Sequence, residues 1–220
     1  MAQWAMLGRF ARFDKPRAPA RSRALQSVYD AAATGWQDGI SKLGFLAAYA
    51  ELMQAVTLHM RPARVLDVGT GTGAFAHAWV DAHGMPGELT LTDISPAMLS
   101  VVSERLPSAR TMVLPLGPEM AALPPQDVVL CAHVIEHLDD PDAALGHLYG
   151  RLRAGGQLVL AMSRPHWCTA LVRWRWGNAA YAPDHAVQML ENAGCCDVAA
   201  VPFSGGQPSR VSHGYIARRA

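Results

Sequence analysis

The chain has 220 residues, and its 19 lysine and arginine residues against 18 acidic residues leave a net charge of +1. Half of the residues are hydrophobic, as in an ordinary globular protein, so nothing global points to a nucleic-acid partner or to a disordered acidic segment. The length allows one α/β domain with a substantial core and is short for two, and no apolar run approaches the length of a transmembrane helix.

Residues 1–24 are predicted to be a basic N-terminal arm that precedes a domain covering residues 25–220. The arm carries six basic residues against one acid, and Pro16 and Pro19 interrupt helical structure in it. Four apolar residues nevertheless recur at helical spacing: Trp4, Leu7, Phe10 and Phe13. Two interpretations stay open, namely a mobile arm or strip packed on the domain, and a basic amphipathic anchor at a membrane surface.

Residues 25–60 are predicted to form two helices ahead of the first strand. Apolar residues recur at helical spacing there, with breaks near Gly35 and Gly39. Tyr29 and Trp36 in this segment have two open interpretations, because they either cover a ligand or simply fill the core.

The segment from Val65 to Gly73 predicts a strand, a tight turn and the start of a helix. An apolar run of strand length is followed by glycines at three alternate positions, Gly69, Gly71 and Gly73. Glycine tolerates positive φ and lets the backbone lie against a ligand, and the following helix directs free N–H groups at the turn. The loop therefore predicts a binding site for a nucleotide-like molecule.

Two carboxylates limit the kinds of ligand that this loop is expected to bind. The loop also fits the loosest dinucleotide fingerprint, but Asp67, two residues before the first glycine, is poorly suited to a pyrophosphate and suits an ammonium group. Residues 88–94 predict the second strand, which contains Asp93, twenty residues past Gly73. A carboxylate there can accept hydrogen bonds from both hydroxyls of a ribose.

The rest of the chain continues an alternation of strands and helices. Further strands are predicted at 111–116, 127–134, 157–162, 197–203 and 213–217, and helices at 142–153 and 184–193. The run at 127–134 is nearly continuously apolar, as expected of a central parallel strand that is buried on both faces.

The run from His133 to His137 matches the H-x-x-E-H motif of inverted zinc peptidases. That chemistry needs both histidines on one face of a helix. Here His133 ends a strand pattern and an Asp-Asp-Pro turn closely follows His137, so we predict no metal site. The two histidines are instead expected at the carboxyl edge of the sheet, where open α/β folds bind ligands.

The glycine loop with Asp67, the acid Asp93, and the run that closes with LRAGGQLVLAMS resemble the class I S-adenosylmethionine (SAM)-dependent methyltransferases over about residues 64–163. The resemblance implies a doubly wound, seven-stranded, mostly parallel sheet with an antiparallel last strand, preceded by N-terminal cap helices. It also implies SAM as the cofactor. The implied cofactor contacts are Tyr29, Asp67, Gly69, Thr70, Gly71, Gly73, Asp93, Ile94, Met98, Glu119, Cys131 and His133.

The methyl group on a sulfonium is already activated, so such an enzyme mainly places a nucleophile in line behind it and excludes water. A general base is needed only if the acceptor is a hydroxyl or a protonated amine. Histidine titrates in the useful range, and the candidates are His133, His137, His166 and His185. No spacing in the sequence selects one of them as a base.

Residues 164–185 are predicted to form much of the acceptor site and its lid. Three tryptophans and three arginines fall in the connection from Arg164 to Tyr181, and they can supply apolar walls, cation–π contacts and a grip on a carboxylate or phosphate. The candidate acceptor-binding residues are Trp36, Trp167, Arg173, Arg175 and Tyr181. An alternative is that the tryptophans pack on the sheet and the arginines face solvent.

The sequence thus predicts methyl transfer from SAM to a small molecule that is anionic, aromatic or lipid-like. Two alternatives remain, a SAM-binding protein without transferase activity and an NAD-dependent oxidoreductase, although no tyrosine–lysine pair supports the latter. The four cysteines show no C-x-x-C spacing, and the N-terminus lacks the apolar region of a secretory signal. We therefore expect free thiols and a cytoplasmic protein.

Overall fold

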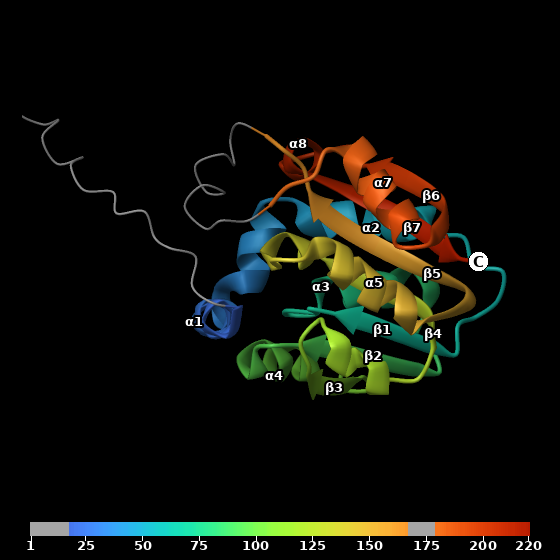
Figure 1. The fold of residues 1–220 in the computed structure, drawn as a ribbon. Coiled ribbons are helices and arrows are strands. Elements are labelled where there is room, and N and C mark those ends of the chain that lie inside the picture. Colours follow the sequence, from blue (N-terminus) through green and yellow to red (C-terminus); the bar gives the residue numbers. More distant parts are fainter. Residues whose placement is uncertain (1–17, 167–178) are drawn as a thin grey trace, which may run out of the picture.

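The computed structural model describes residues 18–166 and 179–220 of the chain. Within them, one sheet of seven strands has the order β3-β2-β1-β4-β5-β7-β6. The strands are β1 (Arg64–Val68), β2 (Glu88–Asp93), β3 (Arg110–Val113), β4 (Gln126–Ala132), β5 (Leu152–Ser163), β6 (Cys195–Pro202) and β7 (Ser212–Arg219). Neighbours among β1 to β5 pair in parallel, whereas β7 is antiparallel to both β5 and β6. The predicted fold class is confirmed (Figure 1).

Helices cover both faces of this sheet. They are α1 (Ala18–Lys42), α2 (Phe45–Ala55), α3 (Ala74–His83), α4 (Pro96–Arg105), α5 (Pro141–Arg151), α7 (Pro183–Asn192) and α8 (Pro208–Val211), with 3-10 helices η1 (Pro118–Ala122) and η2 (Ile135–His137). α2, α3 and α4 contribute to one hydrophobic core, and α5 and α7 contribute to the other. Figure 1 shows α5 and α7 on the near face of the sheet.

The central strands alternate between the two cores because successive side chains of a strand point to opposite faces. In β4, Val128 and Leu130 join the core on the α2–α3 side, while Val129 and Cys131 join the core on the α5–α7 side. All four side chains are at most 1% exposed. A strand buried on both faces explains the continuous apolar run in the sequence.

The predicted break of the first helix near Gly35 and Gly39 is wrong. α1 continues through both glycines to Lys42, and the chain turns instead at Gly44, which has φ 88°. α1 packs against α2 and α4, and these contacts offset the roughly 1 kcal/mol that an interior glycine costs a helix. The helix also begins at Ala18, inside the segment assigned to the arm, with Pro19 in its first turn, where proline is tolerated.

Strand boundaries differ from prediction where proline or glycine intervenes. β3 ends at Val113, before the predicted Leu116, because Pro115 has no N–H group to continue the ladder. β5 begins at Leu152, five residues before the predicted Gln157, and contains Gly155 at φ 72°. These differences leave the carboxyl edge of the sheet intact.

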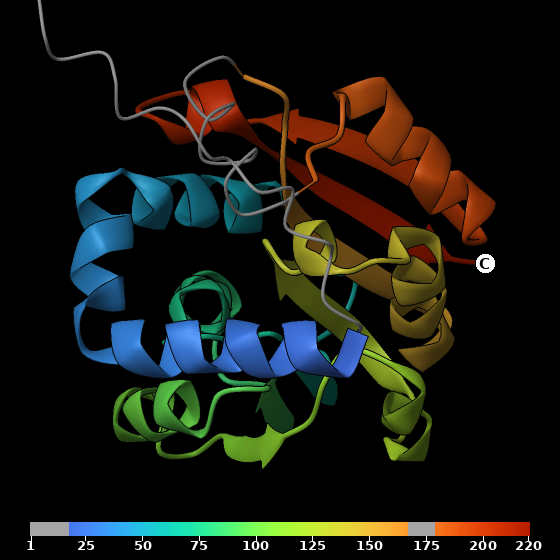
Figure 2. The same cartoon turned by 60° about the vertical axis from the view of Figure 1, so that its left-hand side comes forward.

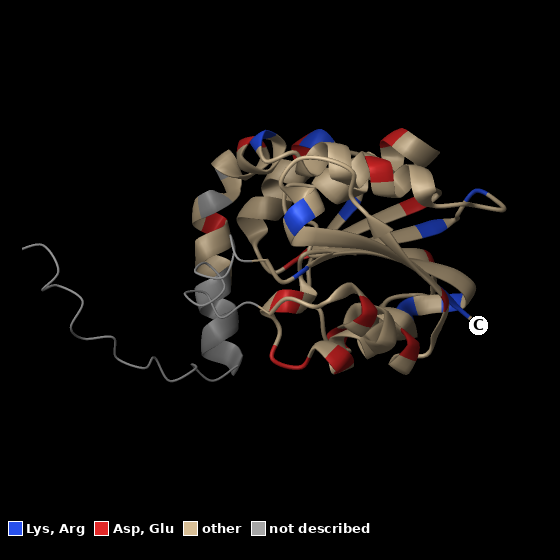
Figure 3. Ribbon diagram, turned by 90° about the horizontal axis from the view of Figure 1, so that it is seen from above, with Lys and Arg blue, Asp and Glu red and all other residues tan. Residues whose placement is uncertain are grey.

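Charged residues of both signs are spread over the described part of the chain (Figure 3), in keeping with the net charge of +1. Among the described helices, none combines the length and the apolar character needed to cross a membrane.

Candidate functional site

The glycine loop between β1 and α3 adopts the conformation that its sequence predicts. Gly69, Gly71 and Gly73 all have positive φ, at 68°, 54° and 81°. A Cβ atom at Gly69 would lie 2.3 Å from Cγ2 of Val134, and one at Gly73 would lie 2.2 Å from Cγ2 of Val102. Packing therefore excludes a side chain at the first and third glycine.

Gly71 differs, because the space above it is open. The nearest atom to a Cβ at this position would be Nε1 of Trp36, at 3.9 Å. The N–H of Gly71 donates to Oδ2 of Asp93 at 2.8 Å, which ties the loop to the end of β2. The middle glycine thus leaves a surface on which a ligand can lie against the backbone.

Asp93 is held by backbone donors at the carboxyl end of β2. Besides Gly71, Ser95 donates its N–H to Oδ1 of Asp93 at 2.9 Å. Burial raises the pKa of Asp93, and these hydrogen bonds oppose that rise. Each carboxylate oxygen retains a lone pair for a further donor, as a ribose site requires.

Asp67 is completely buried in β1, beneath the loop. Its Oδ2 accepts a hydrogen bond from the hydroxyl of Thr70 at 2.7 Å, whereas its Oδ1 is buried without a partner. Burial raises the pKa of this carboxyl group to about 7. A buried acceptor without a donor, at the foot of a ligand loop, fits a ligand that brings an N–H group or a positive charge.

α1 lies across the carboxyl edge of the sheet (Figure 2). Its Gln37 accepts a hydrogen bond from the hydroxyl of Thr72 in the glycine loop at 2.8 Å, and its Asp30 accepts one from the hydroxyl of Ser95. Tyr29 contacts His137. The helix therefore covers the predicted cofactor loop through polar side chains along its length.

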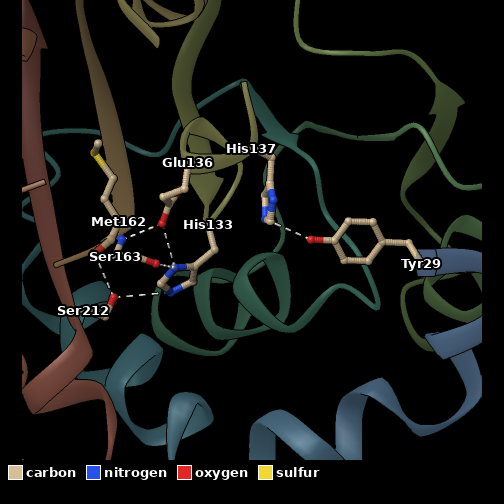
Figure 4. Close-up of polar contacts among 7 residues, drawn as sticks. All are labelled: Tyr29, His133, Glu136, His137, Met162, Ser163 and Ser212. Atoms are coloured by element: carbon tan, nitrogen blue, oxygen red, sulfur yellow. Dashed lines mark hydrogen bonds and ion pairs between the residues drawn. The ribbon is translucent and has the colours of Figure 1, made fainter. Parts of the chain in front are cut away.

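A second polar group lies where β4, β5 and β7 meet at this edge (Figure 4). Nδ1 of His133 is 3.1 Å from Oε1 of Glu136 and 3.4 Å from the hydroxyl of Ser163, and its Nε2 is 3.3 Å from the hydroxyl of Ser212. We call these four residues the His133 cluster. His133 has φ 56°, and Asp197 is the other described residue besides glycine with positive φ.

Glu136 is the buried charge of the His133 cluster, with 2% of its surface exposed. Burial alone would raise the pKa of its carboxyl group, but the hydrogen bond and charge of His133, with the N–H of Ser163 at 2.5 Å, hold it below the usual value. Glu136 is therefore ionised at neutral pH, and its Oε2 lacks a hydrogen-bond partner.

The H-x-x-E-H run is divided between a loop and the single turn of η2. The ring of His133 faces Glu136 and Ser212, while Nε2 of His137 is 3.1 Å from the hydroxyl of Tyr29 (Figure 4). Within residues 18–166 and 179–220, no group of three or more histidine, cysteine or acidic side chains could hold a metal ion.

The remaining cofactor candidates differ in accessibility. Ile94 is half-buried next to Asp93. Met98 and Cys131 are at most 1% exposed, so neither side chain offers surface to a ligand in this arrangement. Glu119 is exposed on η1.

The acceptor candidates are only partly described. Tyr181 is buried, donates its N–H to the carbonyl of Ser163 and lies with its ring 6.1 Å from that of His185. His166 lines a cavity of about 590 Å³ together with Ser204 and Arg210. Trp167, Arg173 and Arg175 lie outside the described residues.

The structure adds site residues that the sequence did not single out. Gln37 gave no signal beyond its place in a helix, and Ser163 and Ser212 gave none because their role depends on the meeting of β5 and β7. Glu136 attracted notice only as the base of a zinc motif. A buried acid directly after a central strand was the available signal for it.

Comparison with known proteins identifies relatives of the central part of the chain. A family model described as a methyltransferase domain matches residues 66–158. A ubiquinone/menaquinone biosynthesis C-methyltransferase UbiE from Neisseria meningitidis serogroup C is 34% identical over 110 residues, which cover 47% of this chain and 44% of that protein. The UbiE protein of Bordetella avium is 37% identical over 113 residues, covering 48% and 44%. The match thus spans less than half the length of these relatives.

Solved structures share the fold over nearly the whole chain. The N-methyltransferase NodS from Bradyrhizobium japonicum, in complex with S-adenosyl-L-homocysteine (SAH), has a TM-score of 0.68 at 17% identity and covers 90% of this chain and 98% of its own. The magnesium protoporphyrin IX methyltransferase ChlM from Synechocystis, with bound SAH, has a TM-score of 0.68 at 16% identity, covering 91% and 100%. At these identities the likeness is one of fold.

Proposed function

We propose that the chain is a class I SAM-dependent methyltransferase and that it transfers the methyl group of SAM to a small-molecule acceptor. The observation that carries the proposal is that two buried carboxylates, Asp67 and Asp93, accompany a glycine, Gly71, with open space above it. Asp93 and the space above Gly71 suit a ribose and the adjoining chain, and the unpartnered Oδ1 of Asp67 suits the ammonium group.

Each of these residues of the carboxyl edge is proposed to hold a particular part of SAM. Asp93 would hold the ribose hydroxyls, and Asp67 with the backbone of Gly69 to Gly73 would hold the amino acid end. α1 would cover the bound molecule and exclude water through Tyr29 and Gln37. When bound, SAM supplies a methyl group on a positively charged sulfur, which needs no further activation.

The acceptor is proposed to be a small molecule because the relatives act in the biosynthesis of ubiquinone and menaquinone and the solved neighbours include small-molecule methyltransferases. We place its binding region at residues 164–185, of which 164–166 and 179–185, including Tyr181, are described. An anionic, aromatic or lipid-like acceptor suits the tryptophans and arginines in this segment. Residues 1–24 are proposed as a second contact, to anionic membranes, when such an acceptor is lipid-like.

Two measurements test the proposal. Mass spectrometry of the molecule carried through purification, with calorimetry of added SAM and NAD, separates a methyltransferase from an oxidoreductase. Release of SAH from SAM in the presence of a metabolite panel then separates an active transferase from an inert binder. Binding of NAD in place of SAM, or binding of SAM without turnover on any acceptor, would contradict the proposed activity.

A further inference from the structure

The His133 cluster lies at the carboxyl edge of the sheet. His133 follows β4, Ser163 ends β5 and Ser212 begins β7, so the ends of three adjacent strands contribute to it. In open α/β sheets, ligands bind outside the carboxyl ends of the strands. The side chain of His133 is 24% exposed, whereas Glu136 and Ser212 behind it are buried. The imidazole is therefore the accessible member of the cluster.

The backbone and the surroundings hold this imidazole in one orientation. His133 keeps a positive φ of 56°, and its N–H donates to the carbonyl of Ala161 at 2.8 Å. The rings of Phe45 and Tyr49 from α2 lie 5.3 Å and 6.4 Å from the imidazole. A left-handed conformation at a residue other than glycine is held by its surroundings and is frequent at functional sites.

The hydrogen bonds of the cluster accommodate two protonation states of the ring. With a neutral ring, Nδ1–H donates to Glu136, and the hydroxyl of Ser212 donates to the carbonyl of Met162, which leaves the lone pair of Nε2 for a proton. With a protonated ring, Nε2–H donates to Ser212, whose hydroxyl donates to the carbonyl of Met162 at 3.0 Å. The hydroxyl of Ser212 keeps the Met162 carbonyl as its acceptor in both states, so the ring can gain a proton and every donor keeps an acceptor. Figure 4 draws the contacts of the cluster.

We propose that His133 is the general base for the methyl acceptor and that Glu136 is the positioning residue that holds its Nδ1–H. The proposal rests on the proposed function and narrows it to an acceptor whose nucleophilic atom carries a proton, such as a hydroxyl or protonated amine, or is activated by loss of one. The proton of the acceptor moves to Nε2 of His133 as the bond to the methyl carbon forms. The bond from that carbon to sulfur breaks, SAH leaves as a neutral thioether, and the imidazolium returns its proton to water.

Three other described histidines have different surroundings. Nε2 of His137 lies 3.1 Å from the hydroxyl of Tyr29. His213 is 8% exposed, and burial lowers its pKa. His77 does pair with an acid, Asp81, at 3.0 Å, but on the exposed face of α3. His133 combines a buried carboxylate, an accessible ring and a position at the end of a central strand. The titratable groups that face it include Glu136 from η2 and Tyr49 from α2.

The test compares variants of the full chain in SAH release from SAM, with a protein-free small-molecule extract of bacterial cells as the acceptor source. Because general bases typically contribute about 10²–10⁴-fold, His133→Ala should lose about a hundredfold or more in turnover with SAM affinity within about threefold of wild type. Added imidazole should restore turnover at least about tenfold in this variant. His77→Ala removes an exposed histidine–acid pair and serves as the matched control.

Glu136→Gln tests whether Glu136 orients His133 or only stabilises the fold. The amide oxygen of glutamine still accepts the N–H of Ser163, but the side chain carries no charge. The substitution should lower turnover by about tenfold, move its pH profile and leave the fold and SAM affinity intact. Turnover of His133→Ala within about threefold of wild type would overturn the proposal. A loss of turnover that imidazole does not restore, together with an equal loss of SAM affinity, would also overturn the proposal.

A separate measurement distinguishes failure of this inference from failure of the proposed function. If the wild-type protein binds SAM but converts nothing in the extract, the transferase activity is contradicted. The ¹⁵N NMR signals of the His133 imidazole in the SAH complex then show which ring nitrogen carries the proton, which tests the pairing of His133 with Glu136. Nδ1 of His133 should stay protonated while Nε2 gains a proton as the pH falls, and Glu136→Gln should abolish this order. A neutral His133 ring with its proton on Nε2 would refute the proposed pairing with Glu136.

Discussion

Replacing Asp67 by asparagine should remove a loss of stability that the free protein undergoes as the pH rises, and should weaken SAM binding. The side chain is completely buried and its pKa is raised from 3.8 to about 7. In the unfolded chain the same carboxyl group ionises near pH 4. The folded protein therefore retains a proton that the unfolded chain loses between pH 4 and pH 7, and the free energy of unfolding falls as the pH rises through this window.

The magnitude follows from the two pKa values. A shift of about 3 units corresponds to about 4 kcal/mol of lost stability well above pH 7. Between pH 5 and pH 8 the loss is about 2–3 kcal/mol, because part of the difference has already developed at pH 5. Asp67→Asn cannot ionise, so this pH-dependent loss disappears. Any fixed cost of burying the amide, such as an altered hydrogen bond to Thr70, is the same at both pH values and cancels.

Urea unfolding of wild type and Asp67→Asn at pH 5 and pH 8 provides the assay. The stability of the variant relative to wild type should improve by about 2–3 kcal/mol from pH 5 to pH 8. A relative stability that stays constant to within about 0.5 kcal/mol would refute the reasoning about buried ionisation. In calorimetry, wild type should bind SAM more tightly as the pH rises, and the variant should bind it weakly at both values. Equal SAM affinity of the two proteins would remove the ammonium assignment.

Three further changes have defined outcomes. Asp93→Ala should weaken SAM binding by about ten- to a hundredfold, since a charge-assisted hydrogen bond contributes roughly 1.5–3 kcal/mol, and unchanged affinity in calorimetry would contradict the ribose role. Gly69→Ala should destabilise the fold by about 2–4 kcal/mol, because φ is 68° at this position and the new Cβ would lie 2.3 Å from Val134. The control Gly39→Ala in α1 should stabilise the fold by about 0.5–1 kcal/mol. Thermal melts that rank the two variants in the opposite order would refute the packing account. Arg173→Gln with Arg175→Gln should raise the acceptor KM and leave SAM affinity intact, and unchanged acceptor kinetics would remove these arginines from the proposed acceptor site.

The sequence by itself determined the fold class and the conformation of the glycine loop. The strand–glycine–helix pattern at Val65 to Gly73 is local, because positive φ at three positions and a buried strand before them need no distant partner to be recognised. Asp93 could likewise be placed at the end of an alternating strand, and in the structure its carboxylate accepts the N–H of Gly71. The continuous apolar run of β4 identified a central strand for the same reason.

Only the tertiary structure decided which polar groups meet at the edge of the sheet. Residues 133, 163 and 212 lie far apart in the sequence, and His133 contacts Ser163 and Ser212 because β4, β5 and β7 are neighbours in the sheet order. The continuity of α1 through Gly35 and Gly39 also depends on tertiary contacts, since local propensity predicts a break that packing on α2 and α4 overrides. Local conformation is encoded in neighbouring residues, whereas a site built from several strand ends exists only once the sheet has assembled.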